Sequence, residues 1–248
     1  MMKPRLYVDA HLEIDLELIL DPEHRHYLIN TLRRKQGSEV LLFNGAIPEC
    51  EWEAVMVQTH PDARLLIGKK ILVKRESTLS ITLVAGLLKG DAMEWSIQKA
   101  AELGVVRFIP LLTQRTVARL PPERWPAKEK RWKKIIQESA EQCERVRLME
   151  IHPPMALPQL SAIVDQGRRY LFWEEESASL PRLTSLKPSG TGVTVITGSE
   201  GGFTTEEVQL ARQQLGCDVV TLGPRIVRAE TAALAVVVAM QTLWGDMG

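Results

Sequence analysis

The sequence predicts an α/β protein built from two parts. From about residue 75 onward, β-branched apolar segments alternate with helical segments, the order that gives a parallel sheet covered by helices. Before that point, short segments of alternating apolar and polar residues dominate, which is typical of a small β-rich module. The 248 residues are 45% hydrophobic and 25% charged, a composition that allows a sizeable core.

The N-terminal part, residues 1–74, is expected to hold several strands and a single helix. The expected strands are RLYVD, EVLLFN, EWEAVMVQT and RLLIGKKILV. Turn signals interrupt them at Asn44-Gly45 and at His60-Pro61-Asp62. The helix is expected in the insert DPEHRHYLINTLRRK.

The C-terminal part, residues 75–248, is expected to alternate strand and helix. Its expected strands are ITLVAGLL, VVRFIP, YLFW, VTVIT and VVTL. Its expected helices cover residues 91–103, 127–145 and 230–244, with another that begins at Thr204. The last of these helices is apolar nearly all round, so we expect it either to be central to the fold or to pack on a second subunit.

Helix boundary signals support two of these helices. Asp91 with Glu94 has the spacing of a capping box, in which two side chains satisfy the first backbone N–H groups. Thr204 has the same spacing from a glutamate three residues later, and glycines follow both helices at positions 104 and 216.

The composition argues against several classes of protein. No apolar run is long enough to span a membrane, and the start, MMKPRLYVDAHLEID, lacks a signal-peptide pattern, so a cytoplasmic location is expected. Cys50, Cys143 and Cys217 are widely spaced and predict neither a disulfide framework nor a zinc site. His24 and His26 are two residues apart and would not face each other on a helix, so we expect no metal.

Positive charge is concentrated although the net charge is zero. Basic residues outnumber acidic ones between residues 107 and 147, and smaller basic groups occur at residues 33–35 and 69–75. Such clusters suit a phosphate backbone. A solvated helix face is the alternative for any charge run.

The segment ITGSEGGFT places a glycine-rich turn between a strand and a helix. Ligands of α/β sheets bind at such strand ends. The pattern of Gly198, Gly201 and Gly202 is neither a dinucleotide nor a triphosphate motif, and Glu200 in the turn would repel phosphate. The expected ligand is therefore neutral or cationic, unless the glycines only permit a tight turn.

A second loop, LGPRIVRAETAALAV, repeats this arrangement after the next strand. It places Arg225, Arg228, Glu230 and Thr231 at the start of the last helix. The glutamate and threonine could simply cap that helix, but two arginines beside an apolar helix need partners. Trp173 follows a third strand and is expected at the same rim.

Four segments in this order resemble the RsmE family of 16S ribosomal RNA uridine N3-methyltransferases, which belong to the SPOUT class. They are LLKGDAMEWSIQKAAELGV, IIQESAEQCERVR, ITGSEGGFT and LGPRIVRAETA. The N-terminal HYLINTLRRKQGSEVLLFNG is similar to the PUA-like domain of that family. The chain departs from the family at Ser199, where proline is usual, and at Ala229, where threonine is frequent.

The resemblance implies a PUA-like β-barrel domain that binds RNA over residues 1–74. It implies a SPOUT α/β domain with a trefoil knot over residues 75–248. It also implies S-adenosylmethionine (SAM) as cofactor, a homodimer, and 16S rRNA within the small ribosomal subunit as partner, with no membrane partner. A methyltransferase of the same class acting on another rRNA or tRNA nucleotide, and a non-catalytic RNA-binding protein, are the alternatives.

Site residues follow from the resemblance by matching motifs. Arg225, Arg228 and Glu230 are the expected catalytic residues, with Glu200 a further candidate carboxylate. The expected cofactor-binding residues are Trp173, Thr197, Gly198, Glu200, Gly201, Gly202, Leu222, Gly223, Ile226, Val227, Arg228 and Thr231. The expected RNA contacts are Arg33, Arg34, Arg115, Arg119, Arg124, Lys130, Arg131, Lys133 and Lys134.

Overall fold

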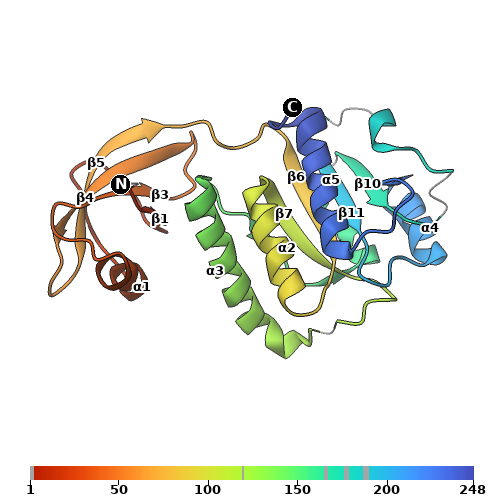
Figure 1. Ribbon diagram of the computed structural model, residues 1–248, viewed down its shortest axis with the longest axis horizontal. Helices are drawn as coiled ribbons and strands as arrows, with labels where there is room; N and C mark the ends of the chain where they lie inside the picture. Colours follow the sequence, from red (N-terminus) through yellow and green to blue (C-terminus); the bar gives the residue numbers. More distant parts are fainter. Residues whose placement is uncertain (1–2, 119, 165–166, 176–178, 187–189) are drawn as a thin grey trace. The chain divides into compact units, whose positions relative to one another are not determined.

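The protein forms two compact units in the computed structural model, which describes residues 3–118, 120–164, 167–175, 179–186 and 190–248. One unit comprises residues 1–76 and 140–148, and the other comprises residues 77–139 and 149–248. Figure 1 shows the elements of each unit in sequence colours. The expected mixed α/β architecture is confirmed.

The N-terminal unit contains a five-stranded sheet in the order β1-β3-β4-β5-β2. Strands β3, β4, β5 and β2 pair antiparallel, whereas β1 pairs parallel with β3. The strands are β1 (Arg5–Tyr7), β2 (Glu17–Ile19), β3 (Glu39–Phe43), β4 (Cys50–Gln58) and β5 (Arg64–Leu72). The four expected strands are therefore present, and β2 is an addition because only Leu18 and Ile19 are apolar in it, too few to give a visible pattern.

The expected single helix after residue 21 is instead two short helical pieces. The first is the α-helix α1 (Pro22–Arg25), and the second is the π-helix η1 (His26–Thr31). The Asp21 carboxylate accepts the first N–H groups of α1 at 2.9 Å, as an N-cap does. Leu28 is the only fully buried residue of the two pieces, so tertiary anchoring of that side chain outweighs helix propensity here.

The C-terminal end of α3 (Trp125–Cys143) packs within the N-terminal unit. Arg5 is buried and donates from Nε to Glu51 Oε1 at 2.8 Å. Its guanidinium also reaches the backbone carbonyls of Ala140, Glu141, Glu144 and Arg145. Helix ends leave such carbonyls without intrahelical partners, so Arg5 is one of the contacts that group residues 140–148 with the N-terminal unit, together with the Arg145–Glu76 ion pair.

The C-terminal unit contains the expected parallel sheet. Seven strands take part, in the order β12-β10-β11-β6-β7-β8, with β9 also paired to β7. All of their pairings are parallel. The strands are β6 (Ser80–Gly86), β7 (Val105–Leu112), β8 (Glu150–Ile151), β9 (Met155–Ala156), β10 (Arg168–Phe172), β11 (Gly192–Thr197) and β12 (Asp218–Val220).

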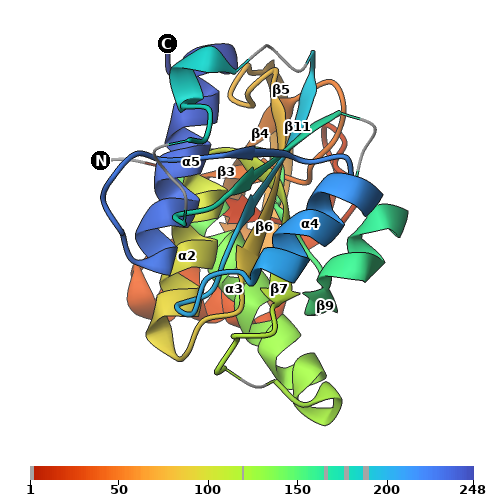
Figure 2. The same cartoon turned by 90° about the vertical axis from the view of Figure 1, so that its right-hand side faces the viewer.

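Helices cover both faces of this sheet. Helices α2 (Asp91–Glu102) and α5 (Ala229–Trp244) pack together on one face, and α4 (Thr205–Gln214) covers the other beside the 3-10 helix η3 (Leu157–Ala162), as Figure 2 shows. Gln241 of α5 is fully buried and donates to the Leu103 carbonyl at 2.9 Å. This bond satisfies a carbonyl at the end of α2 and joins the two helices.

The two capping-box predictions have different outcomes. The box at Thr204 is confirmed, with both of its hydrogen bonds to Glu207 present. The box at Asp91 is wrong, because Gly90 occupies the cap position at φ +56° and Asp91 is already helical. Glycine takes this backbone conformation without strain, and the Asp91 carboxylate in the first turn still favours the helix dipole.

Helix α5 is not buried on every side within one chain. Val236, Val237 and Met240 are fully buried against the sheet and α2. On the opposite side, Val238 is 40% exposed, and Leu243 near the C-terminal end of the helix is 43% exposed. The helix therefore leaves two large apolar side chains partly in water.

The three cysteines are free, and Cys50 and Cys217 are buried. Burial raises the pKa of the Cys217 thiol to about 12. None of the helices that the structure describes combines the length and apolarity of a membrane span. Nor do the described residues bring three or more His, Cys, Asp or Glu side chains together as a metal-binding group.

We predict that Cys217 resists alkylation in the folded protein. The thiolate is the nucleophile, and with a pKa of about 12 only roughly one part in ten thousand is ionised at pH 8. Brief iodoacetamide treatment followed by peptide mass mapping should label Cys217 far less before unfolding in urea than after it. Equal labelling under the two conditions would show that the thiol is accessible and ionised in the fold.

Candidate functional site

Three loops meet at one edge of the C-terminal sheet. Strand β10 lies between β11 and β12, and Phe172 at its end pairs with Thr197 on one side and Val220 on the other. The two loops singled out in the sequence are thus separated by the strand that carries Trp173. The segments that follow these parallel strands share one edge, the usual position of a ligand site in an open α/β sheet.

A cavity of about 560 Å³ lies between these loops. Its lining includes these expected cofactor-binding residues: Trp173, Thr197, Gly198, Glu200, Gly202, Leu222, Gly223, Ile226, Val227 and Arg228. All three expected catalytic residues, Arg225, Arg228 and Glu230, also line it. Gly201 and Thr231 are not among the lining residues.

Other lining residues escape sequence reasoning. They are Phe172, Ser199, Thr221, Ala92, Ala229 and Ala232, whereas Glu174 lines the cavity as its place directly after Trp173 predicts. Phe172 directly precedes Trp173, so the strand end itself was the available signal. The alanines give no such signal, because a small side chain leaves room for a ligand as readily as it packs in a core.

Glycines give the turn after β11 its shape. Gly202 has φ +68°, and its N–H donates to the Ser199 carbonyl at 2.9 Å. A Cβ atom on Gly198 would lie 3.1 Å from the Gly202 Cα, too close for an ordinary contact. Gly198 and Gly202 therefore permit a tight turn and also line the cavity, so the structural role of these glycines is compatible with a ligand at this turn.

Gly201 faces away from the cavity, toward the segment after β7. A Cβ atom there would lie 2.7 Å from both Cβ and the carbonyl oxygen of Arg115. Arg115 donates from Nη1 to the Gly201 carbonyl at 3.3 Å and to Glu175 Oε1 at 3.2 Å. This close packing explains why Gly201 does not line the cavity.

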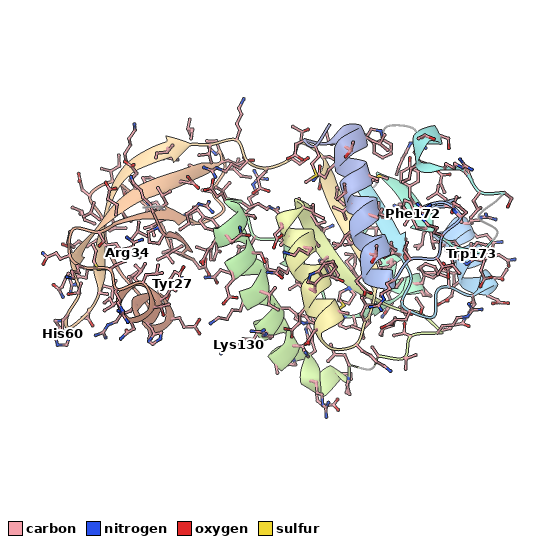
Figure 3. The ribbon with its side chains drawn as sticks, viewed as in Figure 1. Tyr27, Arg34, His60, Lys130, Phe172 and Trp173 are labelled. Atoms are coloured by element: carbon pink, nitrogen blue, oxygen red, sulfur yellow. The ribbon has the colours of Figure 1, made fainter. Side chains whose placement is uncertain are left out.

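Two buried polar atoms at the cavity have no hydrogen-bond partner among the residues that the structure describes. They are Nε1 of Trp173 and Oγ1 of Thr197. The residues are only 5% and 1% exposed, respectively (Figure 3 shows Trp173 at the end of β10). Buried polar atoms are almost always paired, so these two fit a ligand that offers hydrogen-bonding groups.

The remaining lining combines apolar surface with carboxylates. Phe172, Leu222 and Ile226 provide apolar surface, and Glu174 and Glu200 provide negative charge. A ligand with a flat heteroaromatic ring and a positive centre suits this set. S-adenosylmethionine has both features, so the residues present fit the cofactor that the sequence implies.

Arg228 directly precedes α5 and Glu230 lies in its first turn, and both line the cavity. Arg228 Nη1 lies 3.9 Å from Glu230 Oε1, and their side chains are 86% and 20% exposed, respectively. Such an exposed pair contributes little to stability, about 0–1 kcal/mol. The Arg228 guanidinium is therefore accessible to a second molecule that enters the cavity from solvent.

The expected RNA contacts fall into two groups, apart from Arg115, which follows β7 and pairs with Glu175, and Arg119. Arg33 and Arg34 follow η1 in the N-terminal unit. Exposed basic residues of the other unit gather on α3 and the 3-10 helix η2 (Pro122–Arg124) before it: Arg124, Lys130, Arg131, Lys133 and Lys134 (Lys130 is labelled in Figure 3). Arg131 pairs with Glu94 and Lys133 with Glu129. Arg119 lies outside the described residues.

Comparison with known proteins agrees with the motifs. The chain matches the RNA methyltransferase domain family over residues 75–241. It is 32% identical over 222 residues to ribosomal RNA small subunit methyltransferase E of Bacillus subtilis, covering 86% of this chain and 84% of that protein. It is 31% identical over 245 residues to the protein of the same name from Buchnera aphidicola of Schizaphis graminum, covering 98% of each.

Solved structures resemble the chain over its whole length. A methyltransferase from Legionella pneumophila in complex with SAM superposes with a TM-score of 0.91 at 31% identity, covering 99% of this chain and 100% of that one. Ribosomal RNA small subunit methyltransferase E from Neisseria gonorrhoeae, bound to S-adenosyl methionine, gives 0.89 at 28% identity and covers 100% of both chains. This chain therefore belongs to the RNA methyltransferase family, as its four C-terminal motifs predict.

Proposed function

We propose that this protein transfers a methyl group from SAM to N3 of a specific uridine in the 16S rRNA of the small ribosomal subunit. The observation that carries the proposal is the cavity between the loops after β10, β11 and β12, with two buried polar atoms left for a ligand. The names of the relatives and the SAM-bound neighbours support the reaction class. The proposed place of action is the cytoplasm.

The proposal includes the finer architecture that the family resemblance implies. Residues 1–74 would form a PUA-like barrel, and the mostly antiparallel five-stranded sheet with its buried core is compatible with this. Residues 75–248 would form a SPOUT domain with a trefoil knot. The parallel sheet with helices on both faces is compatible with the SPOUT α/β domain.

The cavity residues would hold the cofactor through complementary chemistry. When bound, SAM supplies an activated methyl group carried on a positive sulfur. Trp173 Nε1 would donate a hydrogen bond to the ligand, and Thr197 Oγ1 can donate or accept one. The Glu200 carboxylate would face positive charge, which explains an acidic residue in a glycine-rich turn.

Arg225, Arg228 and Glu230 would act on the uracil. N3 of uridine carries a proton that must leave before or during methyl transfer. Glu230 is the proposed acceptor of that proton, and Glu200 is the other carboxylate at the cavity. The guanidinium of Arg228 would stabilise negative charge that develops on the uracil oxygens, with Arg225 beside it.

We further propose that the chain acts as a homodimer. Trp95 of α2 is 44% exposed, close to the values for Val238 and Leu243 of α5, and these two helices pack side by side. Ile226, which lines the cavity, is 86% exposed. A second copy packed on α2 and α5 would cover exposed apolar side chains and complete the wall of the cavity.

A methylation assay tests the proposed reaction. Purified protein is incubated with methyl-labelled SAM and small ribosomal subunits that lack this modification, with free 16S rRNA alongside. The proposal predicts label at N3 of one uridine of 16S rRNA. Label at another atom or in another RNA would show that the proposed substrate position is wrong. Absence of label in both substrates would reject the proposed reaction.

Replacement of Arg228 tests its role at the uracil. We predict that Arg228→Ala lowers kcat by about 100-fold or more, because an electrostatic contact made in the transition state is lost. The Kd for SAM should change by less than about threefold. Arg212→Ala removes an exposed arginine of α4 that does not line the cavity and should retain wild-type activity. Equal losses in kcat and SAM affinity for Arg228→Ala would contradict this role.

A charge on α5 tests the homodimer. We predict that Val238→Lys converts the dimer to a monomer in sedimentation experiments, because the charge would be buried at the interface. Val55→Lys is the matched control, since Val55 is similarly exposed, at 39%, but lies on β4 of the N-terminal unit. A monomeric wild type, or a Val238→Lys variant that stays dimeric, would contradict the proposed interface.

A further inference from the structure

A short segment after β7 makes several contacts with the glycine-rich turn that follows β11. We call residues 113–116, with the sequence TQRT, the clamp segment. It follows β7 directly and reaches residues that lie more than 80 positions later in the chain. Its contacts all fall within the C-terminal unit.

The central contact joins two buried hydroxyl groups. Thr113 Oγ1 lies 3.3 Å from Ser199 Oγ, and the two residues are 8% and 5% exposed, respectively. Thr113 Oγ1 also lies 3.5 Å from the Gly202 carbonyl oxygen and 2.9 Å from Thr116 Oγ1. Thr113 therefore bridges both ends of the turn that runs from Ser199 to Gly202.

Gln114 and Arg115 of the clamp segment also contact the turn and the start of α4. The Gln114 N–H donates to Glu207 Oε1 at 2.8 Å, and Oε2 of the same carboxylate accepts the Thr204 N–H at 2.9 Å. Arg115 packs against Gly201 and donates to its carbonyl. The turn and the start of α4 are thus held from one side by consecutive residues.

The glycine content of the turn explains why these contacts matter. Gly198, Gly201 and Gly202 give it the shape described above, but glycine also has the greatest backbone freedom of any residue. Residues that line the cavity lie at both ends of this turn. An unsupported turn would lose conformational entropy each time it ordered around a ligand, and the cost would appear as weaker binding.

We propose that Thr113 and Ser199 are positioning residues for the methyl-donor site. Neither hydroxyl is assigned a chemical step. Their contact holds the turn after β11 in the conformation that binds SAM, so the cavity is already formed in the protein without SAM. This inference rests on the proposed function, because it concerns the same cavity.

The test compares Thr113→Val, which keeps the shape but removes the hydroxyl, with Thr113→Ser, which keeps the hydroxyl. Calorimetric titration should show the Kd for SAM raised about fivefold or more in Thr113→Val, because the buried hydroxyl contacts of Thr113 with the turn are lost. Ser199→Ala should raise it similarly, and the double variant by less than the product of the two effects. Thr113→Ser should stay within about twofold of wild type.

Matched measurements separate positioning from loss of stability. Ser139→Ala removes another buried hydroxyl, bonded to the Ile135 carbonyl at 2.6 Å, and should leave the Kd for SAM unchanged. In Thr113→Val, KM for SAM should rise with the Kd, whereas kcat at saturating SAM should stay within about twofold of wild type. A folded Thr113→Val variant with wild-type Kd, or multiplicative effects in the double variant, would overturn the positioning role. Failure of the wild type to bind SAM would instead reject the proposed function.

Discussion

The cavity depends on direct contact between two backbones, at the end of β6 and in the turn after β11. A Cβ atom on Gly86 would lie 2.1 Å from the Ser199 nitrogen and 2.4 Å from the Gly198 carbonyl carbon, and these are backbone atoms that cannot rotate away. Any other residue at position 86 would displace the turn. The three loops can then surround one space because β10, β11 and β12 are adjacent and in register.

Much of this arrangement could be predicted from the sequence because it depends on local patterns. Runs such as VTVIT read as buried strands of a parallel sheet, and glycines after a strand mark a turn. Strand ends of a parallel sheet share an edge, so the residues of ITGSEGGFT and LGPRIVRAETA could be assigned to one site. The acidic residue in the turn argued against a phosphate ligand on charge alone.

What could not be predicted depends on distant parts of the chain. Nothing in residues 140–148 shows that Arg5 binds their carbonyls, because a helical pattern does not reveal which unit receives its end. The π-helical turn at residues 26–31 has no sequence signature separate from an ordinary helix. Thr113 looks like a loop residue until its hydroxyl is seen against Ser199, and the gap of 86 residues hides that pair.

We propose that Trp173 Nε1 and Thr197 Oγ1, which have no hydrogen-bond partner among the described residues, bind the methyl donor. The most direct measurement is the indole N–H signal of Trp173 in nitrogen-15 NMR spectra, assigned with Trp173→Phe and followed as SAM is added. This account predicts that the Trp173 signal shifts to saturation, while the signal of Trp52, in the other unit, does not move. SAM binding that leaves the Trp173 signal unchanged would contradict it.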